Sequence, residues 1–456
     1  MARPRTKPAF ADIQERLADA DYKVRKQAIT QIVRYYSAQA YGPLVLLLQD
    51  GRGDVRSKAV LALGRLADPR AVEPLLAMLA DKNASVRGQV VKTMSCFYDQ
   101  CAVEPLIPLL LDDNRDVRLA TIWVLGNLQD YRATQALIAC LDTQDSDTLQ
   151  RTIYCLGELG DPQAVDALLA LLERGQGEQL AWEIATSLRK IGGERAWQGL
   201  LAVLADQNRS VQTRVSAAAA LRRLACPEMI PSLIEALADP DAEVRCRVIN
   251  VLECLQEPVV IAPLLRLLAD PSEDVCAQAI QALTVLHARE AVEPVIALLD
   301  SSQKQIANMA AIFLGLSQDP RALAPLLSAL SLPEHPALWN VPTALGELGD
   351  AAAFEPLIRY LSSTDDTYSH IRAIYGLGKL GDRRAVKPLI ALLNPNITTY
   401  PEVFELDALI EVLGKLGDPR ARLPLIHLRD RLPERQQYAI TLALTALSHA
   451  DQEPSL

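Results

Sequence analysis

Apolar and polar residues alternate along this chain with the period of amphipathic helices, and the helices come in pairs. In residues 68–97 the first helix has apolar residues at positions 72, 75, 76 and 79, and the second at 86, 90, 91 and 94. Asp68 suits an N-cap and Pro69 a first helical position. Pro74 lies inside the first helix, where we expect it to cause a kink. Two helices of this length cannot bury their apolar faces alone, which predicts stacking on neighbouring pairs.

The same pattern recurs along the chain. The motif Ala-Val-Glu-Pro occurs at residues 71, 102 and 291, and its proline position returns at 43, 74, 105, 136, 167, 199, 231, 263, 294, 325, 356, 388 and 424. Proline fills ten of these thirteen positions, and the spacing between them is nearly constant, with a single longer step before the last. We therefore predict an all-α, superhelical α-solenoid of about thirteen two-helix repeats. The repeats span about residues 12–450 of a single domain, 1–456, with short terminal tails.

Four features interrupt the regular pattern. Val-Arg pairs open the second helix at 24, 55, 86, 117 and 244 but are replaced at 211, 275 and 306. Glycines at 175 and 177 loosen one turn, and prolines within 331–342 predict a second helix that starts late or bends. The longest insertion, 394–404, is either a functional loop or neutral variation in a tolerant turn.

The motif around these helices resembles a known repeat. Val-Arg opens the second helix, Leu-Gly-x-Leu-Gly-Asp closes it, as at 413–418, and Pro-Arg-Ala-Val-x-Pro-Leu follows. This pattern resembles HEAT repeats, specifically the short variety named after phycobilisome lyases. The resemblance implies that the second helices line a concave face. It also implies a binding protein, and it leaves phycobilin lyase-like activity on phycobiliprotein cysteines as the specific alternative.

Charge and composition narrow the classes of partner. Apolar residues make up 50% of the chain and aromatic ones 5%, which fits helix packing better than a β-sandwich. The net charge of −10 makes nucleic acid an unexpected partner. Residues 1–80 carry 13 basic and 8 acidic side chains, a local charge of 13 − 8 = +5. That end either attracts an acidic partner or forms a solvated terminal cap.

The chain shows no sign of a membrane or secreted location. No apolar run has the length of a membrane span, and the basic N-terminus is not followed by an apolar stretch. The eight cysteines show no CxxC spacing, which favours reduced thiols and a cytoplasmic protein.

Signals of catalysis are weak. None of the five histidines is followed by glutamate, so the chain lacks the His-Glu pairs with which the HEAT-like deoxyhypusine hydroxylases hold iron. The glycines of the Leu-Gly-x-Leu-Gly-Asp motif end a helix rather than open one, so they indicate close packing and helix ends instead of a phosphate loop. Cys246, Cys254 and Cys276 fall within reach of one another, although buried packing is the simpler interpretation. We expect no catalytic residue, no metal site and no cofactor, and we favour a non-enzymatic protein.

Large aromatic and arginine side chains at three positions of the second helices are the candidate binding residues. Counted from the Val of Val-Arg as zero, positions 2, 3 and 6 face away from the apolar stripe, and they hold Trp123, Arg151, Tyr154, Trp182, Arg214, Arg247, Trp339, Arg372 and Tyr375. Such residues are the usual anchors of protein interfaces. The alternative is that the rings fill gaps between repeats.

These patterns favour a scaffold or assembly factor that holds a protein partner on its concave face, with a phycobiliprotein subunit as the specific candidate. A lyase-like protein would cradle an open-chain tetrapyrrole, with arginine on its propionates and aromatic rings on its pyrroles. The HEAT-like DNA glycosylases would need a basic concave face, which the acidity of the chain disfavours.

Overall fold

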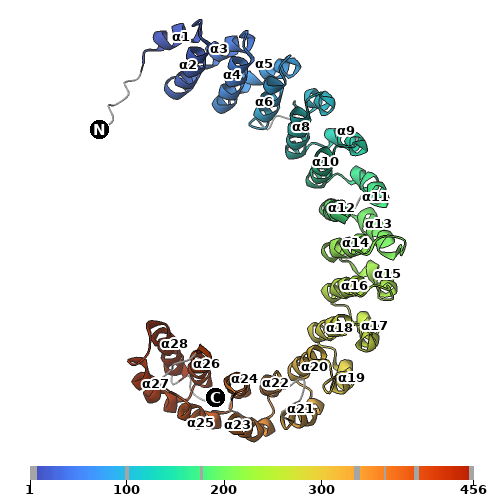
Figure 1. Cartoon of the computed structure of the whole chain (residues 1–456), viewed down its shortest axis with the longest axis vertical. Coiled ribbons are helices and arrows are strands. Elements are labelled where there is room, and N and C mark those ends of the chain that lie inside the picture. The colour runs from blue at the N-terminus through green and yellow to red at the C-terminus, as the bar shows by residue number, and fades with distance from the viewer. Residues whose placement is uncertain are drawn as a thin grey trace. The chain divides into compact units, whose positions relative to one another are not determined.

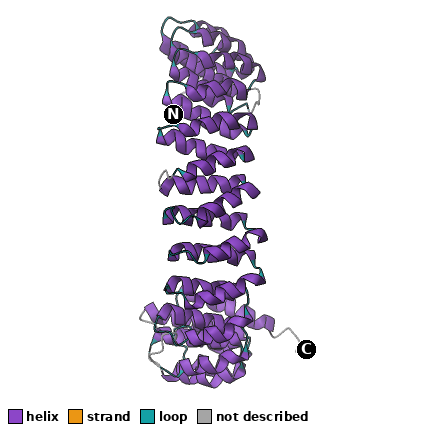
Figure 2. Ribbon diagram, turned by 90° about the vertical axis from the view of Figure 1, so that its right-hand side faces the viewer, coloured by secondary structure: helices purple, strands orange, loops and turns teal. Residues whose placement is uncertain are grey.

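The computed structural model describes residues 8–97, 102–174, 178–332, 339–363, 366–394 and 400–450. Regular structure in these ranges consists of helices alone, 28 α-helices joined by short 3₁₀ turns (Figures 1 and 2). The helices form fourteen pairs, one more than the proline position predicts. The additional pair is α1 (Phe10–Leu17) with α2 (Tyr22–Tyr35), which precedes the first repeat proline, Pro43.

The chain divides into two compact units, Met1–Leu224 and Ala225–Leu456. In the first unit the pairs after α2 have short first helices and longer second helices. The first helices are α3 (Tyr41–Leu46), α5 (Val72–Ala77), α7 (Val103–Leu106), α9 (Thr134–Ala139), α11 (Val165–Glu173) and α13 (Glu194–Ala205). The second helices are α4 (Gly53–Leu66), α6 (Ala84–Met94), α8 (Arg115–Leu128), α10 (Ser146–Leu159), α12 (Glu178–Ile191) and α14 (Val211–Leu224).

The second unit repeats the arrangement with seven pairs. Its first helices are α15 (Ile230–Ala236), α17 (Ile261–Arg266), α19 (Val292–Leu298), α21 (Leu323–Leu330), α23 (Phe354–Ser363), α25 (Val386–Ala391) and α27 (Arg422–Arg429). Its second helices are α16 (Ala242–Leu255), α18 (Glu273–Val285), α20 (Lys304–Leu316), α22 (Val341–Leu348), α24 (Thr367–Leu380), α26 (Tyr400–Leu416) and α28 (Glu434–Ala450).

Stacking of successive second helices builds the core of each unit. Helix α8 packs on α10 and α10 on α12, and α22 packs on α24 in the same way. Figure 1 shows these even-numbered helices on the inner side of each stack and the short odd-numbered ones on the outer side. Leu63, Leu125 and Leu156 are fully buried between neighbouring pairs. The predicted all-α solenoid is therefore confirmed, with each pair completing the core of the next.

The two glycines of the Leu-Gly-x-Leu-Gly-Asp motif have different structural roles. A Cβ on Gly157 would lie 2.7 Å from the Ser187 hydroxyl of the next second helix, so this position needs a hydrogen in place of a side chain. Gly160 ends α10 with φ +72°, the left-handed geometry that glycine adopts without strain. The interpretation of these residues as packing and helix-end glycines is confirmed.

The first helices begin in a 3₁₀ turn whose cap was visible in the sequence. The Asp68 carboxylate accepts the backbone N–H of Arg70 at 3.0 Å, and Pro69 opens the turn. Pro74 is only the third residue of α5, where the missing N–H has no intrahelical partner to lose. The change from 3₁₀ to α geometry precedes Pro74, and the expected kink at the proline stays a prediction.

The arginines of four of the five Val-Arg pairs form nearly buried ion pairs that tie one repeat to the next. Arg56 binds both carboxylate oxygens of Asp81, 25 residues further on, at 2.7 Å, and donates to the Asp50 carbonyl at 2.8 Å. The same ladder of pairs joins Arg25 to Asp50, Arg87 to Asp112 and Arg245 to Asp270.

The charged forms of Arg87 and Asp112 stabilise each other. The side chains are buried or nearly so, and the hydrogen bond from Arg87 holds the pKa of Asp112 below its ordinary value. Each of these aspartates also caps its own turn, since Asp81 accepts the Asn83 N–H at 2.8 Å.

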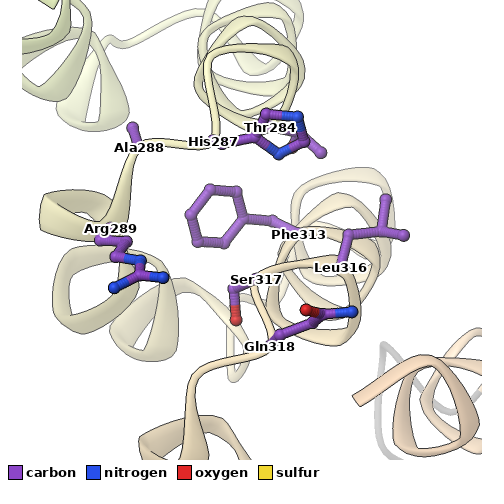
Figure 3. A pocket seen from close by; sticks show the side chains of 8 residues that line it. All are labelled: Thr284, His287, Ala288, Arg289, Phe313, Leu316, Ser317 and Gln318. Atoms are coloured by element: carbon purple, nitrogen blue, oxygen red, sulfur yellow. The ribbon is translucent and has the colours of Figure 1, made fainter. Parts of the chain in front are cut away.

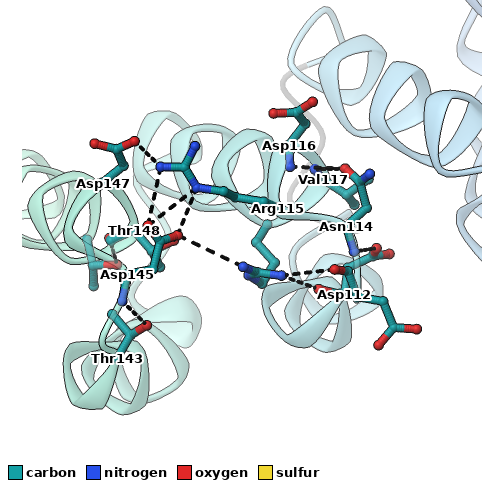
Figure 4. A network of polar contacts seen from close by, with 12 residues as sticks. Asp112, Asn114, Arg115, Asp116, Val117, Thr143, Asp145, Asp147 and Thr148 are labelled. Atoms are coloured by element: carbon teal, nitrogen blue, oxygen red, sulfur yellow. Dashed lines mark hydrogen bonds and ion pairs between the residues drawn. The ribbon is translucent and has the colours of Figure 1, made fainter.

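The ladder changes its pattern between α8 and α10. Thr143 stands where the next aspartate is expected, so Arg118 comes no closer than 3.9 Å to the carboxylate of Asp145 (Figure 4). Arg115 binds Asp145 at 3.1 Å instead, and also pairs with Asp147 on α10. The polar network in Figure 4 therefore holds the N-terminal ends of α8 and α10 together.

The structure confirms one of the predictions made for the irregular segments and corrects another. The second helix of the repeat that contains residues 331–342 does start late, at Val341, and it has only eight residues. Within the longest insertion, residues 395–399 lie outside the described residues, but Tyr400–Leu416 is one continuous helix. Residues 400–404 thus belong to α26 and not to a loop. Residues 175–177 also lie outside the described ranges.

Candidate functional site

Three consecutive second helices of the first unit surround a hollow of about 760 Å³. We call it the aromatic groove. Its lining residues come from α8, α10 and α12, which pack side by side: Leu119, Trp123, Asp147, Gln150, Arg151, Tyr154, Trp182, Glu183, Thr186, Ser187 and Lys190. Four of the nine residues singled out in the sequence therefore meet in one place.

The aromatic rings of this groove are exposed. Trp123, Tyr154 and Trp182 keep 42%, 54% and 55% of their surface accessible, one ring from each helix. Rings that filled gaps between repeats would be buried, as Phe313 is at 2%. Large exposed rings gathered around one hollow are typical of a binding surface.

Most charges in the aromatic groove are neutralised by neighbours. Asp147 pairs with Arg115, and Lys190 pairs with Glu158 while lying 4.6 Å from the centre of the Tyr154 ring. The hydrogen bond between Tyr154 and Glu158 raises the pKa of the tyrosine. The ring is thus a neutral, oriented phenol at physiological pH.

Arg151 is the exception within the aromatic groove. It is exposed, and among the described residues no hydrogen bond or ion pair holds its guanidinium. Two carboxylates, Asp147 and Glu183, also line the groove, but neither forms an ion pair with Arg151, and Asp147 is bound by Arg115. Arg151 is therefore available for an acidic group of a ligand.

A second aromatic cluster lies in the other unit. Trp339 and Tyr368 have ring centres 6.1 Å apart, and the Arg372 guanidinium lies 4.4 Å above the Trp339 ring. Burial lowers the pKa of Arg372. Tyr375 is half-buried, and its hydroxyl donates to Glu411 at 3.3 Å. Arg372 and Tyr375 are thus engaged within the protein, whereas Trp339 and Tyr368 are about half exposed.

Two predicted binding arginines, Arg214 and Arg247, belong to neither aromatic cluster. Arg214 is only 4% exposed, and its guanidinium donates to the Arg209 carbonyl at 2.6 Å. Its expected place on the open face was wrong, because Thr213 and not Val211 is the zero position of α14. Arg214 therefore holds the place that Arg56 has in α4. Arg247 is exposed but pairs with Glu243 at 3.3 Å.

Another hollow, of about 300 Å³, lies between the ends of α18 and α20 (Figure 3). Phe313 points into it, with His287 and Arg289 on one side and Ser317 and Gln318 on the other. Ala288 stands where other repeats have an aspartate that binds the arginine two residues later, as Asp319 binds Arg321 at 2.8 Å, and Glu290 stands at that arginine's position. Sequence reasoning missed this hollow, although the missing aspartate was visible.

The described residues contain no group of three or more His, Cys, Asp or Glu side chains able to hold a metal ion. The thiols are protonated at physiological pH where they are buried, since burial raises the pKa of Cys155 to about 12 and of Cys276 to about 11. Cys276 donates to the Leu268 carbonyl at 3.3 Å and packs as an interior residue. Within the described ranges no helix is long and apolar enough to cross a bilayer.

Comparison with solved structures shows the same fold in larger proteins. Kap121p superposes with a TM-score of 0.66 at 12% identity, covering 96% of this chain and 56% of Kap121p. Kap121p bound to Pho4p gives 0.63 at 13% identity, with the same coverage of 96% and 56%. The chain thus spans about half the length of these neighbours, and at such identity the likeness concerns the fold alone.

Two family models match parts of the chain between residues 11 and 395. A model described as HEAT repeats matches residues 11–95, 73–152, 103–189, 145–214, 198–284 and 261–338. A model described as PBS lyase HEAT-like repeat matches residues 371–395, which include Arg372 and Tyr375. No curated protein matches the chain. Because the HEAT matches together cover residues 11–338, well over half of the sequence, the chain belongs to the HEAT-repeat family.

Proposed function

We propose that this protein is a non-enzymatic scaffold that holds a segment of a protein partner in the aromatic groove. The observation that carries the proposal is the set of three exposed rings, Trp123, Tyr154 and Trp182, around one hollow that Arg151 also lines. Exposed aromatic and arginine side chains supply most of the binding energy at protein interfaces. Kap121p, which shares the fold, has been solved bound to a protein, Pho4p, and this supports a protein ligand.

The lining of the aromatic groove defines the chemistry of the bound segment. The rings offer apolar faces, so the segment needs aliphatic or aromatic side chains to cover them. Arg151 has no carboxylate partner among the described residues, so one acidic side chain of the segment pairs with it. The segment therefore combines apolar residues with an aspartate or glutamate.

The test is capture of the partner from the native host on immobilised full-length protein. A Trp123→Ala/Tyr154→Ala variant should lose the captured protein, because each anchor contributes roughly 1–3 kcal/mol to such interfaces. Tyr131→Ala is the matched control, since Tyr131 is 57% exposed but does not line the groove. Equal capture by all three proteins contradicts the proposal.

A phycobilin lyase-like protein is the second candidate, favoured by the match of residues 371–395 to a PBS lyase HEAT-like repeat. In that case Trp339 and Tyr368 offer ring faces to a tetrapyrrole, although Arg372 already lies over Trp339. The same capture experiment separates the candidates. A coloured eluate containing a phycobiliprotein subunit supports the lyase class, and a colourless partner supports the scaffold.

A further inference from the structure

A basic hollow lies on the second helices at the N-terminal end of the first unit. About 740 Å³ of open volume over α2 and α4 is lined by Lys26, Arg34 and Lys58 together with uncharged residues. An adjoining hollow of about 250 Å³ shares Arg34 and Lys58 and adds Arg65. We call this surface, with its four cations Lys26, Arg34, Lys58 and Arg65, the basic groove.

Helical spacing places these cations in two facing rows. Lys26 and Arg34 are eight residues apart on α2, and Lys58 and Arg65 are seven apart on α4, so each pair lies on one side of its helix. Helix α2 packs directly on α4. The apolar side chains of Val33 and Leu61 line the smaller hollow together with Arg34, Lys58 and Arg65.

The basic groove holds no counter-charge. Neither hollow is lined by an aspartate or glutamate among the described residues, and none of the four cations has an ion pair there. Other arginines of the same helices are fully paired, since Arg25 binds Asp50 and Arg56 binds Asp81. The two helices thus neutralise their arginines at the turns and leave four cations without a carboxylate on the groove face.

Four unpaired cations around one hollow repel one another, and an anionic ligand relieves this repulsion. The rest of the chain, beyond residues 1–80, carries a net charge of −10 − 5 = −15, so an extended polyanion is repelled outside the groove. A short acidic segment needs only the groove itself. Its apolar side chains cover Val33 and Leu61 while its carboxylates meet the cations.

We propose that the basic groove binds an acidic segment of a protein partner, as a contact surface separate from the aromatic groove. The proposal goes beyond the scaffold function above and does not depend on it, because the two grooves share no residue. Where both surfaces bind one partner, the basic groove increases the association rate and fixes the orientation of the complex.

The experiment selects short random peptides, displayed on phage, on the immobilised full-length protein. The selected peptides should contain an excess of Asp and Glu beside apolar residues. Their affinity, measured by fluorescence anisotropy, should fall about tenfold for Arg34→Gln/Lys58→Gln. It should also fall when NaCl rises from about 0.05 M to about 0.5 M, because exposed charges are then screened.

The matched control is Lys23→Gln/Lys82→Gln, which removes two exposed positive charges from the same end of the chain but outside the basic groove. It should bind the acidic peptides as the wild type does. Equal loss in both double variants, or selected peptides without excess acidic residues, overturns the proposal. So does single-stranded DNA that binds more tightly than the peptides. Trp123→Ala/Tyr154→Ala should leave this binding unchanged, so a failure of the scaffold proposal is recognised separately.

Discussion

Removing Arg56 tests the ladder of ion pairs between repeats. The Arg56 and Asp81 side chains are 7% and 5% exposed, and two hydrogen bonds of 2.7 Å join them. Arg56→Ala leaves the Asp81 carboxylate buried without its cation, which costs about 3–5 kcal/mol for a buried pair. Because Asp81 keeps the N–H of Asn83 at 2.8 Å, we expect the lower end, about 3 kcal/mol.

The matched control is Arg70→Ala in the same repeat. Arg70 also binds an aspartate, Asp68, but its side chain is 67% exposed, so water replaces the lost contact. A second variant, Arg56→Leu/Asp81→Asn, removes both charges and should recover part of the loss.

Urea denaturation gives the free energy of unfolding, and hydrogen exchange locates the change. Exchange should accelerate most in α4 and α6, because each repeat contacts only its neighbours and the chain need not unfold in one step. Arg56→Ala that destabilises no more than Arg70→Ala would refute the reasoning that burial, and not pairing itself, gives the ladder its strength.

Three further changes extend these tests. Trp123→Ala and Tyr154→Ala should each weaken partner binding by roughly 1–3 kcal/mol while the melting temperature stays nearly constant; calorimetry that shows large destabilisation would mean that the rings pack between repeats. Gly346→Ala should destabilise the second unit in thermal melts, because the added Cβ would lie 2.2 Å from the Gly376 carbonyl oxygen. Gly88→Ala is the control: its Cβ would meet only Val117, at 3.6 Å, and it should stabilise the protein by about 0.5–1 kcal/mol. The hydrogen bond from Arg321 lowers the pKa of Asp319 from 3.8 to about 2, so its contribution to stability is present above pH 3.8 and is lost as the pH falls towards 2; Asp319→Asn should flatten the dependence of the melting temperature on pH in that range, and an unchanged slope would contradict this.

The sequence predicts the elements better than it predicts the contacts between them. Asp68 and Gly160 act within their own turns, and their roles follow from local rules. Gly157 packs against the next repeat, and its repeated motif indicated close packing without naming Ser187 as the partner. The Arg56–Asp81 pair crosses a repeat boundary, so helical periodicity alone does not reveal it. Several of the Val-Arg arginines are nevertheless followed by an aspartate 25 residues later, and this regular spacing could have indicated the ion pairs.

The candidate site was predicted only in part, for the same reason. Trp123, Tyr154 and Trp182 share one groove because their three helices stack in register. Arg214 was misplaced because α14 has its first buried position two residues later than the apolar Val211 suggests. The basic groove joins Lys26 and Lys58 from neighbouring repeats, and only the local charge of residues 1–80 hinted at it.

The ladder also bears on how such a chain can grow by duplication. Each arginine binds an aspartate of the following repeat, so a copied unit inserted in phase brings an acceptor for the unit before it and a donor for the unit after it. At one boundary only the aspartate is lost: Thr143 stands opposite Arg118, and the Asp145 carboxylate lies 3.9 Å from that arginine instead. At two other boundaries the chain has lost both members together. Where Cys276 replaces the arginine, Ser301 stands at the aspartate position, and where Ala307 replaces it, Leu332 does. The aspartates bind an arginine and also cap their own turn. Ser301 keeps only the second role, since it accepts the Gln303 N–H at 3.2 Å, and the ion pair was lost together with its arginine.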